Sequence, residues 1–127
     1  MEISKEFRFE SAHRLPHTPA DHKCQRLHGH SFRVEVVVSG ELVQPQGWVC
    51  DFADLTAAWQ PIHELIDHRY LNEVEGLSNP TSENIAVWLW PRLLAKLPGL
   101  CRITVHETCT SRAIYTGPQS QASSTSR

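Results

Sequence analysis

Two stretches near the start of the chain alternate between apolar and polar side chains. A period of two residues gives a single apolar face only in an extended strand. On the first stretch that face carries Ile3, Phe7, Phe9, Ser11 and His13. On the second it carries His28, His30, Phe32, Val34, Val36 and Val38, and Val37 is the exception on the opposite face. A polar loop, Pro16–Arg26, separates the stretches. The pattern therefore predicts two neighbouring antiparallel strands.

Helical spacing follows in two later segments. The first has an apolar stripe made of Leu55, Ala58, Trp59, Ile62, Leu65 and Ile66. Pro61 lies inside this stripe and predicts a kink or a break there. A second helix is expected to begin near Pro80–Glu83, where Thr81 can cap the first backbone amides and Glu83 favours the positive end of the helix.

The last part of the chain contains two more strand-like runs, at 102–108 and 112–116. The resulting order predicts an α+β fold, a four-stranded antiparallel sheet with two helices on one face. Phe, Trp and Val side chains assigned to both faces of the sheet lead us to expect partner subunits. Residues 1–117 are expected to form a single domain. Residues 118–127, rich in Ser and Gln, are expected to form a disordered tail.

Charge and cysteine content narrow the possible partners. The formal net charge is -2, so no basic field is available to hold nucleic acid. No apolar run approaches the roughly 20 residues that span a bilayer, and no signal peptide is visible. The four cysteines include no CxxC pair. These features favour reduced thiols and a cytoplasmic location.

Eight histidines in 127 residues are the compositional anomaly. His28 and His30 flank Gly29 and would share one strand face, and His13 lies on the same face of the neighbouring strand. Three neutral imidazoles with an open fourth position are typical of a catalytic zinc site, although iron, copper and nickel also accept imidazole. The alternative is a set of hydrogen-bonded or solvated histidines. Four other histidines are interpreted as ordinary surface or helix residues: His17, His22, His63 and His106.

Four other residues are candidates for chemistry. Cys24 lies four residues before His28 and could be a fourth metal ligand or a free thiol near the metal; spacing alone does not decide. Asp67 and His68 form an acid–imidazole pair after the first apolar stripe, and such pairs also arise by chance at helix ends. Glu107 would share a face with Ile103 and Val105, so its carboxylate would need donors from the protein or a ligand.

These residues lie in motifs that resemble the 6-pyruvoyltetrahydropterin synthase superfamily. The motifs, in chain order, are Phe9–Leu15 (FESAHRL), Cys24–His30 (CQRLHGH), Asp67–Asn72 (DHRYLN), Pro80–Glu83 (PTSE) and Glu107–Thr110 (ETCT). The three-residue gap between Cys24 and His28 is similar to that of the branch that makes 6-carboxytetrahydropterin. The resemblance covers residues 1 to about 117.

The resemblance implies one zinc ion per subunit, held by His13, His28 and His30, with Cys24 as the catalytic base. It implies that Asp67 and His68 are acid–base partners supplied by a neighbouring subunit. It further implies that Glu107, with Thr108 beside it, anchors a pterin ring. The implied fold is the tunnelling fold, in which trimers form a barrel and two trimers form a homo-hexamer.

The implied activity is that of a carbon–carbon lyase. It would convert 7,8-dihydroneopterin triphosphate to 6-carboxy-5,6,7,8-tetrahydropterin, releasing acetaldehyde and triphosphate, in queuosine biosynthesis. The alternatives are a 6-pyruvoyltetrahydropterin synthase, a zinc hydrolase, and a non-catalytic structural module that binds zinc.

Overall fold

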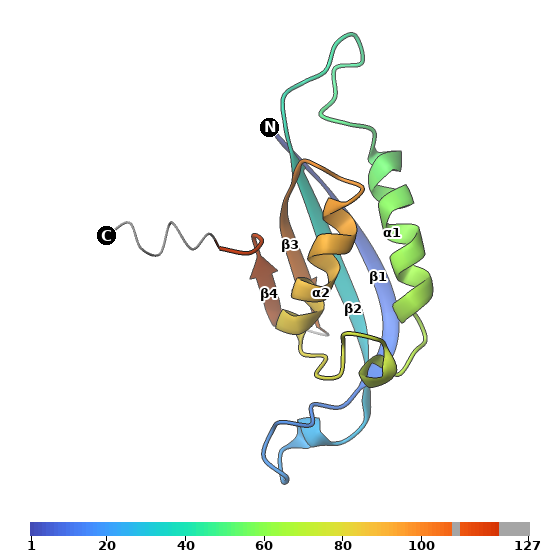
Figure 1. Cartoon of the computed structure of the whole chain (residues 1–127), viewed down its shortest axis with the longest axis vertical. Helices are drawn as coiled ribbons and strands as arrows, with labels where there is room; N and C mark the ends of the chain where they lie inside the picture. The colour runs from blue at the N-terminus through green and yellow to red at the C-terminus, as the bar shows by residue number, and fades with distance from the viewer. Residues whose placement is uncertain (108–109, 120–127) are drawn as a thin grey trace, which may run out of the picture.

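The computed structural model describes residues 1–107 and 110–119 and folds them into a four-stranded antiparallel sheet and two α-helices (Figure 1). The sheet order is β1-β2-β3-β4. The strands are β1 (Glu2–His13), β2 (His28–Ser39), β3 (Leu100–His106) and β4 (Arg112–Tyr115). The helices are α1 (Phe52–Ile66) and α2 (Ser82–Leu94), with short 3₁₀ turns η1 (Lys23–Gln25) and η2 (Leu71–Glu73). The predicted fold class is confirmed.

β1 and β2 pair along their whole length, as their alternation predicts. The register runs without a shift from Glu2 opposite Ser39 to His13 opposite His28. On the apolar face the rings of Phe9 and Phe32 stack with centroids 4.8 Å apart. Because a slip of one residue would turn every side chain to the other face, burial of this face fixes the register.

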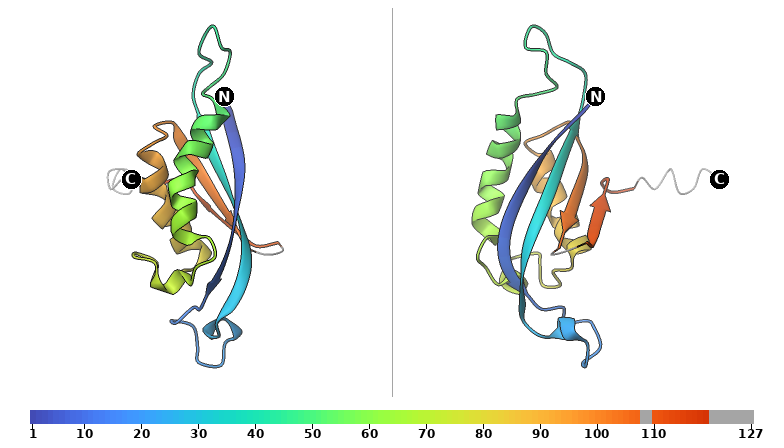
Figure 2. Two further views of the ribbon diagram at one scale, coloured as in Figure 1. Left: turned by 90° about the vertical axis from the view of Figure 1, so that its right-hand side faces the viewer. Right: turned by 180° about the vertical axis from the view of Figure 1, so that it is seen from behind.

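Both helices cover the same face of the sheet, as the side view in Figure 2 shows. Trp59 of α1 stacks on Phe7 of β1 at a centroid distance of 5.0 Å. From α2, Ile85, Leu89 and Leu93 are also buried in this core. Removing such side chains from water contributes on the order of 2 kcal/mol each, so this layer is the main source of stability. None of the described helices is long and apolar enough to cross a membrane.

Thr81 at the start of α2 and Pro61 within α1 are the two residues expected to affect the course of the helices. Thr81 caps α2 as predicted, because its side-chain oxygen accepts a hydrogen bond from the N–H of Asn84 at 3.0 Å. Of the kink or break predicted at Pro61, the break is wrong, since α1 continues through it to Ile66. Pro61 is exposed, whereas buried side chains occur both before and after it, so packing holds the helix across the missing N–H.

The uncovered face of the sheet is mostly charged. Arg33 and Glu6 form an ion pair there at 2.6 Å, and Glu35, Arg102 and Arg112 lie around them. The expectation of Phe, Trp and Val on both faces is therefore wrong. Alternation sends the large apolar side chains of β1–β3 under the helices and leaves Val37 and Ile114 as apolar exceptions on this face.

One end of the sheet gathers the segments that carry the candidate residues. β1 ends there, β2 begins there, and β3 ends beside the start of α2 (Figure 1). The loop 40–51 projects from the opposite end. β3 stops at His106, so Glu107 follows the strand instead of lying in it, because its N–H turns to the carbonyl of Ser111. Thr108 and residues 120–127 of the expected tail lie outside the described residues.

Candidate active site

The paired ends of β1 and β2 bring three imidazoles together. His13 lies opposite His28 in the register, and His30 is the next residue on the same face. The ring centroids are 4.6 Å apart for His13 and His28, 4.9 Å for His13 and His30, and 4.7 Å for His28 and His30. One nitrogen from each ring lies within 4.8 Å of the other two. The predicted cluster of three histidines is therefore present.

The hydrogen bonds of these rings leave nitrogen atoms available to a metal. Nδ1 of the fully buried His13 donates to the carbonyl of Pro80 at 2.8 Å. Its Nε2 is buried and has no hydrogen-bond partner among the described residues. Nδ1 of His28 donates to the carbonyl of Arg26 at 2.7 Å. A ligating histidine commonly donates its second nitrogen in this way, and a buried unpartnered nitrogen needs an occupant. The cluster therefore fits a metal ion.

Burial also favours the uncharged form that ligation requires. It lowers the pKa of His13, and this effect outweighs the opposing influence of the hydrogen bond to Pro80 and of the Glu107 carboxylate. Burial likewise lowers the pKa of His30 against the opposing effect of Glu107. A protonated imidazole cannot bind a metal, so the environment prepares both rings as ligands.

A cavity of about 600 Å³ adjoins the cluster. It is lined by Lys23, Cys24, His28, Gly29, His30, Glu107 and Ser111. Cys24 belongs to this cavity but not to the group of ligand atoms that lie within reach of one ion. The arrangement therefore fits three imidazoles with an open position and a thiol nearby better than a closed site of four ligands.

Glu107 is held by a residue that the sequence reasoning missed. The hydroxyl of Ser82, at the first position of α2, donates to Oε1 of Glu107 at 2.6 Å. The other carboxylate oxygen, Oε2, lies 3.7 Å from Nε2 of His30. The sequence indicates Pro80–Glu83 as the start of a helix. The strand pattern alone could not show that Ser82 faces the end of β3. Thr108 lies outside the described residues.

Asp67 and His68 lie outside the cavity of Cys24. Asp67 is the C-cap of α1, and His68 has a φ of 54°, in the left-handed region that residues other than glycine rarely adopt. His68 lines a cavity of about 640 Å³ together with Glu10, Ser31 and Tyr70, whereas neither Asp67 nor His68 lines the cavity of Cys24. Within one chain the structure thus does not bring the pair together with Cys24.

Residues 2–118 match the family described as 6-pyruvoyl tetrahydropterin synthase. The chain belongs to this family. The predicted resemblance is confirmed, and so is the prediction of an enzyme of the lyase class.

Known proteins resemble the chain in sequence or in structure. The 6-carboxy-5,6,7,8-tetrahydropterin synthase of Synechocystis is 47% identical over 123 residues, which cover 92% of this chain and 94% of that protein. The dihydroneopterin monophosphate aldolase of Pyrococcus furiosus is 44% identical over 75 residues, or 59% of this chain and 62% of that protein. The solved Caenorhabditis elegans 6-pyruvoyl tetrahydropterin synthase superposes with a TM-score of 0.83 at 26% identity, covering 93% of this chain and 96% of that one.

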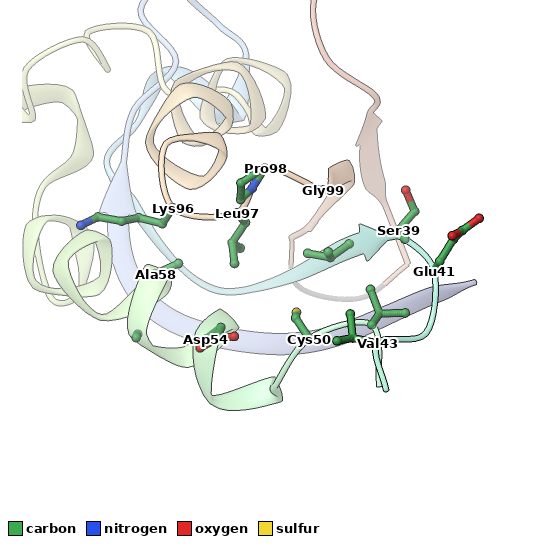
Figure 3. Close-up of a pocket in the computed structure, with 14 residues that line it drawn as sticks. Ser39, Glu41, Val43, Cys50, Asp54, Ala58, Lys96, Leu97, Pro98 and Gly99 are labelled. Atoms are coloured by element: carbon green, nitrogen blue, oxygen red, sulfur yellow. The ribbon is translucent and has the colours of Figure 1, made fainter. Parts of the chain in front are cut away.

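A cavity of about 730 Å³ lies away from these residues, at the opposite end of the sheet (Figure 3). Its walls come from the end of β2, the start of α1 and the segment 96–99, and they include Cys50, Asp54 and Leu97. None of the three clustered histidines lines it. In this member of the pterin synthase family the candidate active site is therefore defined by its donor set and not by the size of the cavity.

Proposed function

We propose that the chain converts 7,8-dihydroneopterin triphosphate and water to 6-carboxy-5,6,7,8-tetrahydropterin, with release of acetaldehyde and triphosphate, as part of queuosine biosynthesis. The observation that carries the proposal is the buried Nε2 of His13, which has no hydrogen-bond partner in the described part of the chain, in a cluster of three imidazoles beside Cys24 and Glu107. The similarity to the carboxytetrahydropterin synthase of Synechocystis supports this choice of product. The catalytic domain is proposed to comprise residues 1–117 and to function in the cytoplasm.

His13, His28 and His30 would hold one zinc ion per subunit. When bound there, zinc supplies Lewis-acid polarisation of substrate oxygen atoms. The carbonyls of Pro80 and Arg26 fix two of the rings so that Nε2 faces the cluster. The backbone therefore prepares these ligands before an ion arrives.

Glu107 would bind the pterin ring. Its carboxylate can accept hydrogen bonds from the amide and amino N–H groups of a pterin, and Thr108 beside it is proposed to contribute to the same contact. The hydroxyl of Ser82 holds one oxygen of the carboxylate and so limits its rotation. The contact orients the ring so that the substrate side chain can lie near Cys24, His28 and His30, which line the same cavity.

Cys24 would act as the base that removes a proton from the substrate side chain next to the ring. Its thiol is free, and the 3₁₀ turn η1 that carries it is fixed by a hydrogen bond from the Cys24 N–H to Nδ1 of His22 at 3.0 Å. Asp67 and His68 would relay protons for this thiol. Since they do not line its cavity in one chain, they are proposed to come from a neighbouring copy.

The proposed assembly is a trimer whose sheets join into a barrel, with two trimers forming a hexamer. The edges available for this are the outer edge of β1 and the edge of β4, since both strands are terminal in the sheet. Edge strands with open hydrogen-bonding groups readily pair with another chain. The charged uncovered face of the sheet would then line the interior of the barrel.

The test is incubation of the zinc-loaded protein with 7,8-dihydroneopterin triphosphate, with products identified by mass spectrometry and acetaldehyde assayed in parallel. Carboxytetrahydropterin with acetaldehyde is the expected result. A pyruvoyl product without acetaldehyde would identify the chain as a 6-pyruvoyltetrahydropterin synthase. Absence of turnover with zinc bound would favour the structural module instead.

A matched pair of variants tests the role of the thiol. Cys24→Ala is expected to abolish turnover while zinc stays bound. Cys101→Ala removes another free thiol, on the uncovered face of the sheet near Glu2, and is expected to keep both turnover and zinc. Loss of zinc in Cys24→Ala alone would identify Cys24 as a metal ligand.

A further inference from the structure

Asp67 is contacted from three directions by other groups. Its Oδ1 accepts a hydrogen bond from the N–H of Glu10 at 2.9 Å. Its Oδ2 accepts one from Nδ1 of His68 at 2.7 Å. Nε2 of His63 lies 3.3 Å from this same Oδ2. His63 was interpreted from the sequence as an ordinary histidine, and no step of the proposed mechanism uses it.

The last turn of α1 places His63 against Asp67. The two residues are four apart, so they fall on the same side of the helix, and the N–H of Asp67 donates to the carbonyl of His63 at 2.9 Å. On its other side the imidazole lies near the buried ring of Trp59, with centroids 6.3 Å apart. The His63 side chain is 32% exposed, so it is partly shielded from solvent.

His68 depends on the carboxylate for its orientation. Its side chain is 77% exposed, and the bond from Nδ1 to Asp67 ties the ring to the protein. The backbone of His68 is fixed in the left-handed region by a short hydrogen bond from its N–H to the carbonyl of Glu10. Strained backbone of this kind persists only where the surroundings enforce it. The position of Oδ2 therefore decides where the imidazole is presented.

We propose that His63 is a positioning residue for Asp67 and His68: its imidazole holds Oδ2 from the helix side, so that the carboxylate keeps His68 with Nδ1 bound and Nε2 directed outward. The inference rests on the proposed acid–base role of Asp67 and His68. The N–H of Glu10 holds Oδ1, and a carboxylate held there alone can still pivot; the ion-pair contact of His63 at Oδ2 limits that rotation. The same logic applies wherever an acid orients a catalytic imidazole.

The charge on Asp67 is consistent with this role. Burial alone would raise the pKa of Asp67, but the hydrogen bonds from Glu10 and His68, together with the nearby His63, lower it below the ordinary value. The carboxylate thus remains ionised near neutral pH, so it can accept the hydrogen bond from His68 and keep its contact with His63.

Three variants separate positioning from packing. His63→Phe keeps a ring beside Trp59 and removes the donor, His63→Gln keeps a donor on a flexible chain, and His63→Ala serves as a second donor-free variant should the Phe variant not fold. The zinc-loaded proteins are labelled with ¹⁵N-histidine, and the His68 resonances are assigned with His68→Ala. The spectra report which ring nitrogen of His68 is protonated and hydrogen-bonded.

The donor-free variants are expected to lose the signature of a bound Nδ1–H on His68 without substrate, while zinc content is unchanged. The kcat should fall roughly tenfold with little change in KM, a fraction of the about 10²- to 10⁴-fold that a positioned acid–base group contributes. His63→Gln should recover most of both signals. An unchanged His68 spectrum in His63→Phe or His63→Ala would overturn the proposal.

Failure of the proposed function gives a different result. If His68→Ala has the same kcat as the wild type, then His68 has no acid–base role. In that case kcat is expected to be unchanged in every His63 variant. The spectral arm needs no turnover, so it still decides whether His63 holds Asp67 and His68 in place.

Discussion

At the scale of single residues, several functional side chains of the site are oriented by hydrogen bonds to backbone groups. The carbonyls of Pro80 and Arg26 orient His13 and His28, and the N–H of Glu10 orients Asp67. Backbone groups move less than side chains, so each functional group retains its direction in the absence of ligand.

The first prediction concerns the metal. His28→Ala removes one of three imidazoles from a half-buried position, and zinc affinity should fall by on the order of 100-fold or more because the remaining ligands are too few for a stable site. Zinc content after dialysis against a chelator, measured by mass spectrometry, is the readout. His17→Ala, which removes an exposed histidine from the loop after β1, should retain zinc. Equal zinc in the two variants would contradict the three-histidine site.

The second prediction concerns acid stability. Since the pKa of Asp67 in the folded chain lies below the ordinary 3.8, the unfolded chain binds this proton first as the pH falls. The stability from Asp67 is therefore fully present above pH 3.8 and is lost as the pH falls through the folded-state pKa. Asp67→Asn should unfold with a shallower acid dependence, measured by urea titration at a series of acid pH values.

The matched control for that measurement is Asp54→Asn, which changes an exposed carboxylate in the first turn of the same helix. It changes a carboxylate that takes no part in the contacts of Asp67, so a change that both variants share does not come from those contacts. A steeper or unchanged dependence in Asp67→Asn would show that the hydrogen bonds from Glu10 and His68 do not hold the carboxylate ionised.

At the scale of elements, the sequence predicts what a repeating pattern determines. The alternation of β1 and β2 predicts their pairing and with it the meeting of His13 with His28 and His30, because register and face follow from a period of two. The start of α2 is also predictable, since Thr81 offers a local cap.

Contacts between distant segments were not predictable in this way. The continuation of α1 through Pro61 depends on core packing around the helix, and the bond from Ser82 to Glu107 joins residues 25 apart. His63 and Asp67 are four residues apart, a spacing that brings side chains together on a helix. Because Asp67 was expected to lie beyond the helix, this spacing did not predict their contact. Charge on the uncovered face was visible in the sequence, although apolar residues were wrongly assigned to both faces.

The third prediction concerns the segment after β4, which packs on α2. Gly117 has a φ of +98°, and an added Cβ would lie 2.6 Å from Cζ2 of Trp90. Gly117→Ala should lower the free energy of unfolding by about 2–4 kcal/mol, from backbone strain and overpacking together. Gly47→Ala also has a positive φ, but nothing lies within 4 Å of its added Cβ, so it should cost only about 1 kcal/mol. Equal losses in chemical denaturation would show that Trp90 yields to the extra methyl group.

At the scale of the whole molecule, only part of the outer edge of β1 is available to pair with another copy. The N–H groups of Glu10 and Ala12 bond outward, to the side chain of Asp67 and the carbonyl of Arg69. Because backbone groups alternate along a strand, the even-numbered residues from Ser4 to Arg8 present their N–H and C=O groups on the same outer edge. This segment is the part of β1 that another copy can pair with.

The fourth prediction tests that edge. Arg8→Pro removes an outward N–H without removing a hydrogen bond to β2, so the domain should fold while assembly is weakened. Light scattering after gel filtration should show a smaller particle for Arg8→Pro, whereas Arg8→Ala, which keeps the N–H, should match the wild type. A monomeric wild type would contradict the proposed barrel, and so would an Arg8→Pro protein of unchanged mass.

The direct pairing of His13 with His28 has a consequence for how the chain reaches its final form. A metal that needs both strands can be chelated only when they are aligned residue for residue, because a slip of one position turns the imidazoles to opposite sides. Binding of the ion would then stabilise only the correct register of the hairpin. Chelators present during refolding should therefore lower the yield of folded protein more than chelators added afterwards.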